Sequence, residues 1–204
     1  MKISKNLILL NIISLLIFIF ILIEILYKGF IVNWDLSINS LILTIENNFL
    51  TILSKTFSFI FDTTSIIIIS LVILIYLWFK DSKKDSIFFA IAMILDLAII
   101  FILKEMAQRA RPLNSLIFET GFAFPSGHST TTVVFFGSLT YLILSKNKLK
   151  SIRLTTILIS VFTILLIGFT RLYLNVHWLT DILGGFAIGT FILTGSIIVK
   201  QLID

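Results

Sequence analysis

The two histidines of the chain, its only ones, stand near residues that can orient them. His177 lies four residues before Asp181, so on one helix the two side chains would share a face and the carboxylate would lean back toward the ring. A carboxylate on one ring nitrogen fixes the tautomer and leaves the other nitrogen free as a nucleophile or base. Arg171 adds a cation to the same short segment. Residues 171–181 therefore predict one half of a catalytic site.

Residues 104–128 predict the other half, a site for an anion. Lys104 and Arg111 are two helical turns apart and should point the same way from the end of a helix. Pro125-Ser126-Gly127-His128 opens the next apolar segment, where free backbone N–H groups and the helix dipole favour an anion. Together with Arg171, these residues suit a phosphate group, whose charge is about −2 at neutral pH.

The predicted chemistry is phosphoryl transfer. His177, backed by Asp181, is placed to attack phosphorus, and His128, beside the phosphate-binding backbone, is placed to protonate the departing oxygen. The cations would stabilise the charge that develops on the equatorial oxygens. Two histidines and one aspartate are possible ligands of a divalent ion, but the neighbouring cations would repel it. We therefore expect no metal and no cofactor.

Composition places these residues in a membrane protein. Of the 204 residues 58% are hydrophobic and 13% are charged, and the mean hydropathy is +1.10, a balance that excludes an ordinary soluble domain. Several apolar runs approach the roughly 20 residues that cross a bilayer, and strand-like alternation is missing, so a helical bundle is expected. The lack of cysteine excludes disulfides, thiolate catalysis and Cys-ligated metals. We attribute the net charge of +5 to loop lysines near lipid headgroups and expect no nucleic-acid partner.

The predicted fold class is all-α: one membrane domain over residues 1–204, with six transmembrane helices and an amphipathic interfacial helix after the first. The expected spans are 7–26, 57–79, 87–103, 125–144, 154–170 and 178–199, and the expected interfacial helix is 33–55. A retained first span is favoured over a signal peptide because its apolar run is long and no small-residue cleavage site follows. Gly185 and Gly189 are expected to permit close helix packing in the last span.

The distribution of basic residues predicts the orientation. If both termini are cytoplasmic, six spans put ten of the sixteen Lys and Arg residues inside, as the positive-inside rule requires. Residues 104–128 and 171–181 then both fall on the non-cytoplasmic face of the cell membrane, where they can meet. Arg109, Glu119, Glu24 and Trp178 either line the entrance there or anchor helices at the interface.

The three motifs also resemble a known family. Lys104-x6-Arg111-Pro112, Pro125-Ser126-Gly127-His128 and Arg171-x5-His177-x3-Asp181 are similar, in order and spacing, to the signature of the type 2 phosphatidic acid phosphatase superfamily. The resemblance implies a six-helix membrane phosphatase with a phosphohistidine intermediate, in which His177 is the nucleophile, Asp181 its partner and His128 the general acid. It implies that the phosphate is bound by Lys104, Arg111, Ser126, Gly127 and Arg171. The family usually has Ser before the arginine of the third motif, where this chain has Thr170, so a phosphate contact from that hydroxyl is left open.

For the substrate, the resemblance implies a lipid phosphate or diphosphate that enters from the outer face with its tail between helices. Undecaprenyl diphosphate is the first expectation, on family analogy, and phosphatidylglycerophosphate or phosphatidic acid are the alternatives. A non-catalytic lipid-phosphate-binding or transport protein is the alternative from another class, since it would need the cations but not two histidines. Asp96, near the middle of the third span, belongs to no motif, and both a structural pairing and a substrate role are open.

Overall fold

The described part of the chain is helical throughout, as the sequence predicts. The computed structural model describes residues 4–80 and 82–203, and no strand occurs among them. They form eight helices: α1 (Lys5–Leu26), α2 (Val32–Thr44), α3 (Asn48–Ile60), α4 (Thr63–Phe79), α5 (Lys83–Ala107), α6 (Gly127–Lys146), α7 (Lys150–Tyr173) and α8 (Leu179–Ile203).

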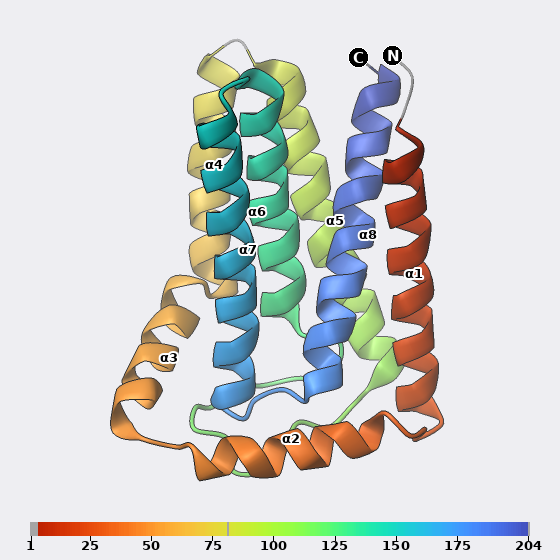
Figure 1. The fold of residues 1–204 in the computed structure, drawn as a ribbon, viewed down its shortest axis with the longest axis vertical. Coiled ribbons are helices and arrows are strands. Elements are labelled where there is room, and N and C mark those ends of the chain that lie inside the picture. The colour runs from red at the N-terminus through yellow and green to blue at the C-terminus, as the bar shows by residue number, and fades with distance from the viewer. Residues whose placement is uncertain (1–3, 81, 204) are drawn as a thin grey trace.

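The long helices stand side by side, and one short helix crosses their end. Figure 1 shows α1 and α4 to α8 running nearly parallel, with the start of α1 and the end of α8 at one end of the bundle. At the opposite end α2 lies across the bundle, and α3 rises from it at an angle beside α7. The loop between α5 and α6 and the turn between α7 and α8 lie at the same end as α2.

Four helices among the described residues are long and apolar enough to cross a membrane, namely α1, α5, α7 and α8. The pair α3 and α4, bent by 45° at the break between them, makes a fifth candidate if it forms one span. The helix α6 is not among these candidates, since its first turns hold His128 and several Ser and Thr residues. Length and composition thus give a membrane bundle of four or five candidate spans, fewer than the six expected.

The expectation of one interfacial helix over residues 33–55 is wrong. The chain forms α2 and α3 instead, with a break before Asn47, whose side chain accepts a hydrogen bond from the Leu50 N–H (2.9 Å) and so caps α3. The span expected from residue 57 likewise begins as α4, capped by Asp62, which accepts from the Thr64 N–H (3.1 Å). Asn and Asp side chains compete for backbone donors, so they favour a helix start over a continuous helix.

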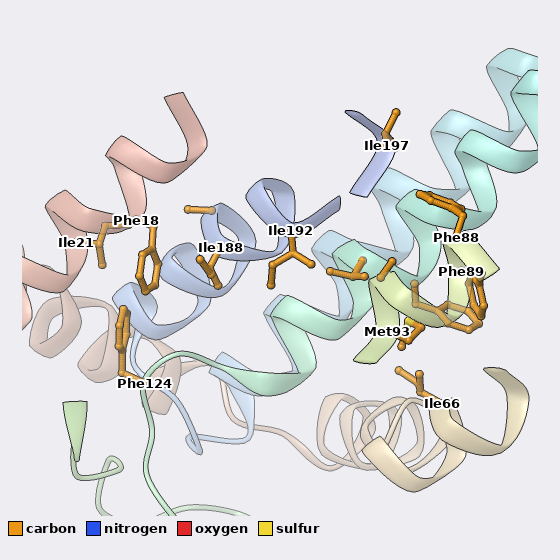
Figure 2. Packing of buried hydrophobic residues seen from close by; sticks show 14 of the residues in the cluster. Phe18, Ile21, Ile66, Phe88, Phe89, Met93, Phe124, Ile188, Ile192 and Ile197 are labelled. Carbon is orange, nitrogen blue, oxygen red and sulfur yellow. The ribbon is translucent and has the colours of Figure 1, made fainter. Parts of the chain in front are cut away.

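Buried apolar side chains of α8 pack between those of α1 on one side and those of α4 and α5 on the other. Figure 2 shows Phe18 of α1 facing Phe124 of the loop before α6, and these rings stack with centroids 5.7 Å apart. Ile188 and Ile192 of α8 lie between this pair and a group of buried residues on α4 and α5. This core fixes the loop before α6 against α1 and α8.

The two glycines of α8 allow that helix to lie directly on α6. A Cβ atom at Gly185 would lie 2.9 Å from the Ser126 carbonyl oxygen, and one at Gly189 would lie 2.8 Å from the Thr130 carbonyl oxygen. Both approaches are closer than a side chain permits, so the expected packing role is confirmed. In a membrane, such backbone approaches contribute van der Waals contact and stabilise helix association. Here they hold the start of α6 against the first half of α8.

Candidate active site

The two polar segments meet at the end of the bundle that α2 covers. The backbone N–H of Ser126, just before α6, donates to the carbonyl oxygen of Asp181 in the first turn of α8 (3.0 Å). The N–H of Leu116 in the loop before α6 donates to the carbonyl oxygen of Leu174, just after α7 (2.9 Å). These contacts bring segments 104–128 and 171–181 together, as the sequence predicts.

His177 and Asp181 face each other, although they do not share a helix. The helix α8 begins at Leu179, so His177 lies in the preceding turn, with its Nδ1 atom 3.5 Å from Asp181 Oδ2. The same oxygen accepts the Trp178 N–H at 2.8 Å, as an acidic residue at the third helical position commonly does. This bond holds the carboxylate beside the ring. Among the described residues, His177 Nδ1 has no hydrogen-bond partner.

Arg111 contacts the other ring nitrogen of His177. Its Nη1 atom lies 3.2 Å from His177 Nε2 and donates to the Val176 carbonyl oxygen at 2.8 Å. Its Nε and Nη2 atoms donate to the carbonyl oxygens of Gly121 (3.1 Å) and Thr120 (3.0 Å). Because a guanidinium can only donate, we assign the lone pair to Nε2 and the proton to Nδ1, which faces Asp181.

The surroundings of His177 keep its ring uncharged. Its burial lowers the pKa of His177 well below the usual value of 6.5, and the positive charges of Arg111, Arg171 and Lys104 lower it further. All three predicted cations therefore lie close enough to act on one ring. A neutral imidazole with its lone pair on Nε2 is the form that can act as a nucleophile.

Glu119 links two of these cations. Arg171 is fully buried at the end of α7 and donates to Glu119 and to Ser58 of α3. The second carboxylate oxygen of Glu119 lies 3.8 Å from Arg111. Burial alone would raise the pKa of Glu119, but the charge and hydrogen bond of Arg171 hold it below its usual value, so the side chain is ionised. Glu119 thus belongs to the site and is more than an interfacial anchor.

Lys104 also faces the loop before α6. Its ammonium group donates to the carbonyl oxygen of Phe122, next to the two carbonyls that Arg111 contacts. Gly121 in this loop has a φ of +72°, a backbone conformation that glycine adopts without strain. Two predicted phosphate ligands therefore converge on the backbone of residues 120–122. They do not project from one helix, as their spacing predicts, because α5 ends at Ala107 and Arg111 lies in the loop that follows.

The start of α6 has the expected form, but the helix begins at Gly127, two residues after the predicted start at Pro125. Ser126 is the N-cap and accepts from the Ser129 N–H at 3.4 Å, while Gly127 is the first helical residue. A Cβ atom at Gly127 would meet only one atom within 4 Å, at 3.8 Å, so the backbone can be approached closely there. His128 is buried, and its Nε2 atom lies 3.9 Å from Asp62 Oδ1 at the start of α4. Asp62 is thus a neighbour of the predicted general acid that the sequence did not reveal.

Two residues left open by the sequence, Thr170 and Asp96, hydrogen-bond to neighbouring groups of the bundle. The Thr170 hydroxyl donates to the Ile167 carbonyl oxygen of its own helix (2.8 Å). Asp96 is fully buried on α5, and its Oδ2 atom accepts from the Thr131 hydroxyl of α6 (2.6 Å), one turn beyond His128. Asp96 therefore has a structural partner. Among residues 4–80 and 82–203, no group of three or more His, Asp or Glu side chains is arranged to hold a metal ion.

Arg109 contacts the outer side of Asp181. Its Nη1 atom donates to Asp181 Oδ1 at 2.5 Å and to the Thr180 hydroxyl at 2.7 Å. Its Nη2 atom donates to Asp35 of α2 at 2.5 Å. The sequence assigns Asp35 only to the polar face of an amphipathic helix, and nothing in its spacing indicates that it lies beside a residue 146 positions away.

Comparisons with known proteins agree with this fold. The sequence model of the family described as the PAP2 superfamily matches residues 85–202. Phosphatidylglycerophosphatase B of Bacillus subtilis is 38% identical over 95 residues, which are 43% of this chain and 44% of that protein. Undecaprenyl-diphosphatase of Sulfolobus acidocaldarius is 25% identical over 121 residues, 56% of this chain and 54% of that protein. The chain thus spans about half the length of the curated relatives that it matches.

Two solved structures share the fold. The crystal structure of the first transmembrane PAP2 type phosphatidylglycerolphosphate phosphatase from Bacillus subtilis matches with a TM-score of 0.83 and 24% identity, over 94% of this chain and 97% of that one. The crystal structure of LpxE from Aquifex aeolicus matches with a TM-score of 0.62 and 23% identity, over 79% and 93%. The first match includes nearly the whole chain, so the bundle is a known membrane fold.

Proposed function

We propose that this chain, which belongs to the PAP2 superfamily, is a membrane lipid phosphatase that acts through a phosphohistidine intermediate. The observation that carries the proposal is the arrangement around His177. Its Nε2 atom faces Arg111, its Nδ1 atom faces Asp181, and its ring is kept neutral by burial and by three cations. A binding protein would need the cations alone, whereas a neutral, oriented imidazole serves a nucleophile.

In the proposed reaction, His177 Nε2 attacks phosphorus, an N–P bond forms, and the bond from phosphorus to the lipid oxygen breaks. Asp181 stabilises the positive charge that develops on the ring, because its Oδ2 atom lies 3.5 Å from Nδ1. His128 gives a proton to the leaving oxygen and then accepts one from the water that cleaves the N–P bond. Asp62 Oδ1, 3.9 Å from His128 Nε2, would pair with the ring while it carries the proton that the first step requires.

Arg111 and Lys104 supply the donors for the phosphate oxygens. Both now donate to neutral backbone carbonyls of the loop before α6. Their hydrogen bonds to an anionic phosphate would be stronger than these. Arg111 Nη1 already lies beside the attacking nitrogen, so a phosphoryl group on Nε2 would be within its reach. Arg171 adds a third charge, and Ser126 and Gly127 present the N-terminus of α6.

We further propose that the bundle has six spans, with α3 and α4 forming the second and α6 the fourth. Support for α6 comes from its place alongside α5 and α7 in Figure 1 and from the site that occupies its polar first turns. The basic residues of segments 80–84 and 146–153 then lie on the cytoplasmic side and the site on the opposite side. Trp34 and Leu36 are more than half exposed on α2, as an interfacial helix requires.

Two lipid substrates are supported equally. Phosphatidylglycerophosphate is favoured by the name of the relative with the higher identity, and undecaprenyl diphosphate by the name of the other. Phosphatidic acid is the third candidate. Each has a phosphate ester or diphosphate on an apolar tail, and the site chemistry derived above applies to all three.

Purified protein in detergent should release phosphate from at least one of these three lipids, and added EDTA should leave the rate unchanged. His177→Ala and His128→Ala should each lose most of the turnover. Absence of phosphate release from all three lipids, or full activity of His177→Ala, would refute the proposed function. Lipid-phosphate binding without turnover would instead favour a binding or transport protein.

A further inference from the structure

We propose that Arg109 is a positioning residue for the catalytic pair, fixed in place by Asp35 of the interfacial helix α2. The role deepens the proposed function and rests on it, because the group that Arg109 holds is the carboxylate beside the nucleophile. Arg109 lies inside the first motif but at none of the motif positions, and Asp35 lies 69 residues before the first of them.

The two oxygens of Asp181 have separate partners. Oδ2 accepts the Trp178 N–H at 2.8 Å and lies 3.5 Å from His177 Nδ1. Oδ1 receives Arg109 at 2.5 Å. The side chain of Asp181 is fully buried, so without Arg109 its Oδ1 atom would lose its charged donor, and one restraint on rotation of the carboxylate about the Cβ–Cγ bond would be gone. Arg109 therefore determines which oxygen the ring of His177 meets.

Arg109 is itself held on several sides. Gln108, in the left-handed conformation (φ 43°), ends α5 and turns the chain. The Arg109 carbonyl oxygen accepts the Ala123 N–H at 2.8 Å, and its guanidinium lies over the Trp178 ring, 5.7 Å from the centroid. The remaining fixed point is Asp35, to which Nη2 donates. A side chain held in this way can position another group accurately.

Asp35 connects this arrangement to α2. Its side chain is 1% exposed and accepts from the Thr180 N–H (2.9 Å) and the Thr180 hydroxyl (2.7 Å), as well as from Arg109. Two buried carboxylates, Asp35 and Asp181, thus flank a single guanidinium. Loss of Arg109 would leave these two negative charges facing each other, and the catalytic carboxylate would move away from its partner ring.

The contacts of Arg109 differ from those of Arg111 and Lys104, two of the proposed phosphate ligands. Both of its terminal nitrogens donate to carboxylates, whereas Arg111 and Lys104 donate to neutral backbone carbonyls. A phosphate would have to displace two hydrogen-bonded carboxylates from Arg109, whereas the hydrogen-bond acceptors of Arg111 and Lys104 are neutral carbonyls and the nearest carboxylate to Arg111, Glu119, lies 3.8 Å away. Arg109 therefore acts through Asp181, and its loss should affect the chemical step more than substrate binding.

The kinetic test compares Arg109→Gln, Arg109→Lys and Asp35→Asn with the matched control Asn11→Ala. The control removes a polar contact between α1 and α8, where Asn11 donates to the Phe191 carbonyl oxygen (2.8 Å), without contact to the site. Arg109→Gln should lower kcat about 10- to 100-fold, with KM and inhibition by inorganic phosphate changed less than about threefold. Arg109→Lys should recover part of the loss, and the losses of Arg109→Gln and Asp35→Asn should be non-additive when combined.

Two kinetic results would overturn the positioning role. The first is that Arg109→Gln and Asn11→Ala have equal kcat values and lose similar thermal stability. The contact of Arg109 with Asp181 would then be merely structural. The second is a preserved kcat with weaker phosphate inhibition, which would make Arg109 a phosphate ligand. If Arg109→Gln does not fold, the same comparison is made with Arg109→Lys, which keeps the charge.

A second measurement does not depend on turnover. The chain has two histidines, so ¹⁵N-histidine NMR of His128→Gln reports on His177 alone. The Nδ1–H tautomer should dominate in this background, and adding Arg109→Gln should raise the share of the other tautomer. If Arg109→Gln leaves the ¹⁵N shifts of His177 unchanged, the positioning role is refuted even if no lipid is hydrolysed. If the wild-type protein hydrolyses none of the lipids but Arg109→Gln shifts the ¹⁵N signals, only the proposed function is refuted.

Discussion

Replacement of Gly185 by alanine tests how closely α8 supports the catalytic start of α6. The added Cβ would lie 2.9 Å from the Ser126 carbonyl oxygen and from Ser129 Cβ, where ordinary contact begins at 3.4 Å, so these atoms must move by 3.4 − 2.9 = 0.5 Å. The Ser126 backbone cannot yield alone, because its N–H donates to the Asp181 carbonyl oxygen. The shift would therefore carry the whole start of α6, including His128.

The structure gives a magnitude for both stability and rate. Overpacking of this kind costs about 1–3 kcal/mol, and for a chain of about 200 residues each kcal/mol lowers Tm by about 2–4 °C. A displacement of 1 Å near reacting groups can cost about 100-fold in rate, so half that displacement should cost about tenfold. Gly185→Ala should thus melt at lower temperature and lose most of its phosphate-release activity.

Gly195→Ala is the matched control, because it lies on the same helix. Its Cβ would meet only Asn11 Nδ2, at 3.6 Å, which is ordinary contact, so its Tm should not fall and its activity should be kept. The assays are thermal unfolding in detergent and phosphate release from the preferred lipid. If Gly185→Ala is as stable and as active as Gly195→Ala, the close packing of α8 on α6 does not position the site.

Four further outcomes are expected. Because burial and nearby cations depress the pKa of His177, the unfolded chain binds a proton there that the fold excludes, so thermal stability should fall as pH drops below 6.5. Arg111→Gln removes one of these cations, so the pKa of His177 should rise and the acidic limb of the kcat/KM profile should move to higher pH. Tyr173→Phe removes hydroxyl contacts to the start of α3 and should cost about 1 kcal/mol in thermal unfolding with little change in kcat, whereas a large fall in kcat would place this contact in the catalytic support. Cysteines introduced at Lys83 and Ser115 should react with a membrane-impermeant reagent from opposite sides of the membrane, and labelling of both from one side would contradict the proposed orientation.

Local chemistry made much of the site predictable. The pairs His177 with Asp181 and Lys104 with Arg111 are close in sequence, so their members were expected to lie near each other before any fold was known, although neither pair lies on one helix. The start of α6 was predictable for the same reason, since Ser126 caps a helix within its own turn. The membrane class followed from composition, because apolar residues in such excess require a lipid environment.

The boundaries around α2 and α3 were predicted less well. Apolar spacing continues through Asn47 and Asp62, so periodicity alone favours unbroken helices. The break depends on which backbone donors each side chain captures, and this competition is decided when the ends of α3 and α4 pack against the bundle.

By itself, the sequence determined the membrane bundle and indicated the candidate catalytic residues and the chemistry for which they are suited, because each motif is local and each residue type has few functions in an apolar chain. Only the tertiary structure decided what holds those residues: Glu119 between two arginines, Asp62 beside His128, and Asp35 with Arg109 behind Asp181. These contacts join segments from four separate parts of the chain. An isolated acidic residue looks the same in a sequence whether it faces water or a buried guanidinium, and the packing of the helices makes that distinction.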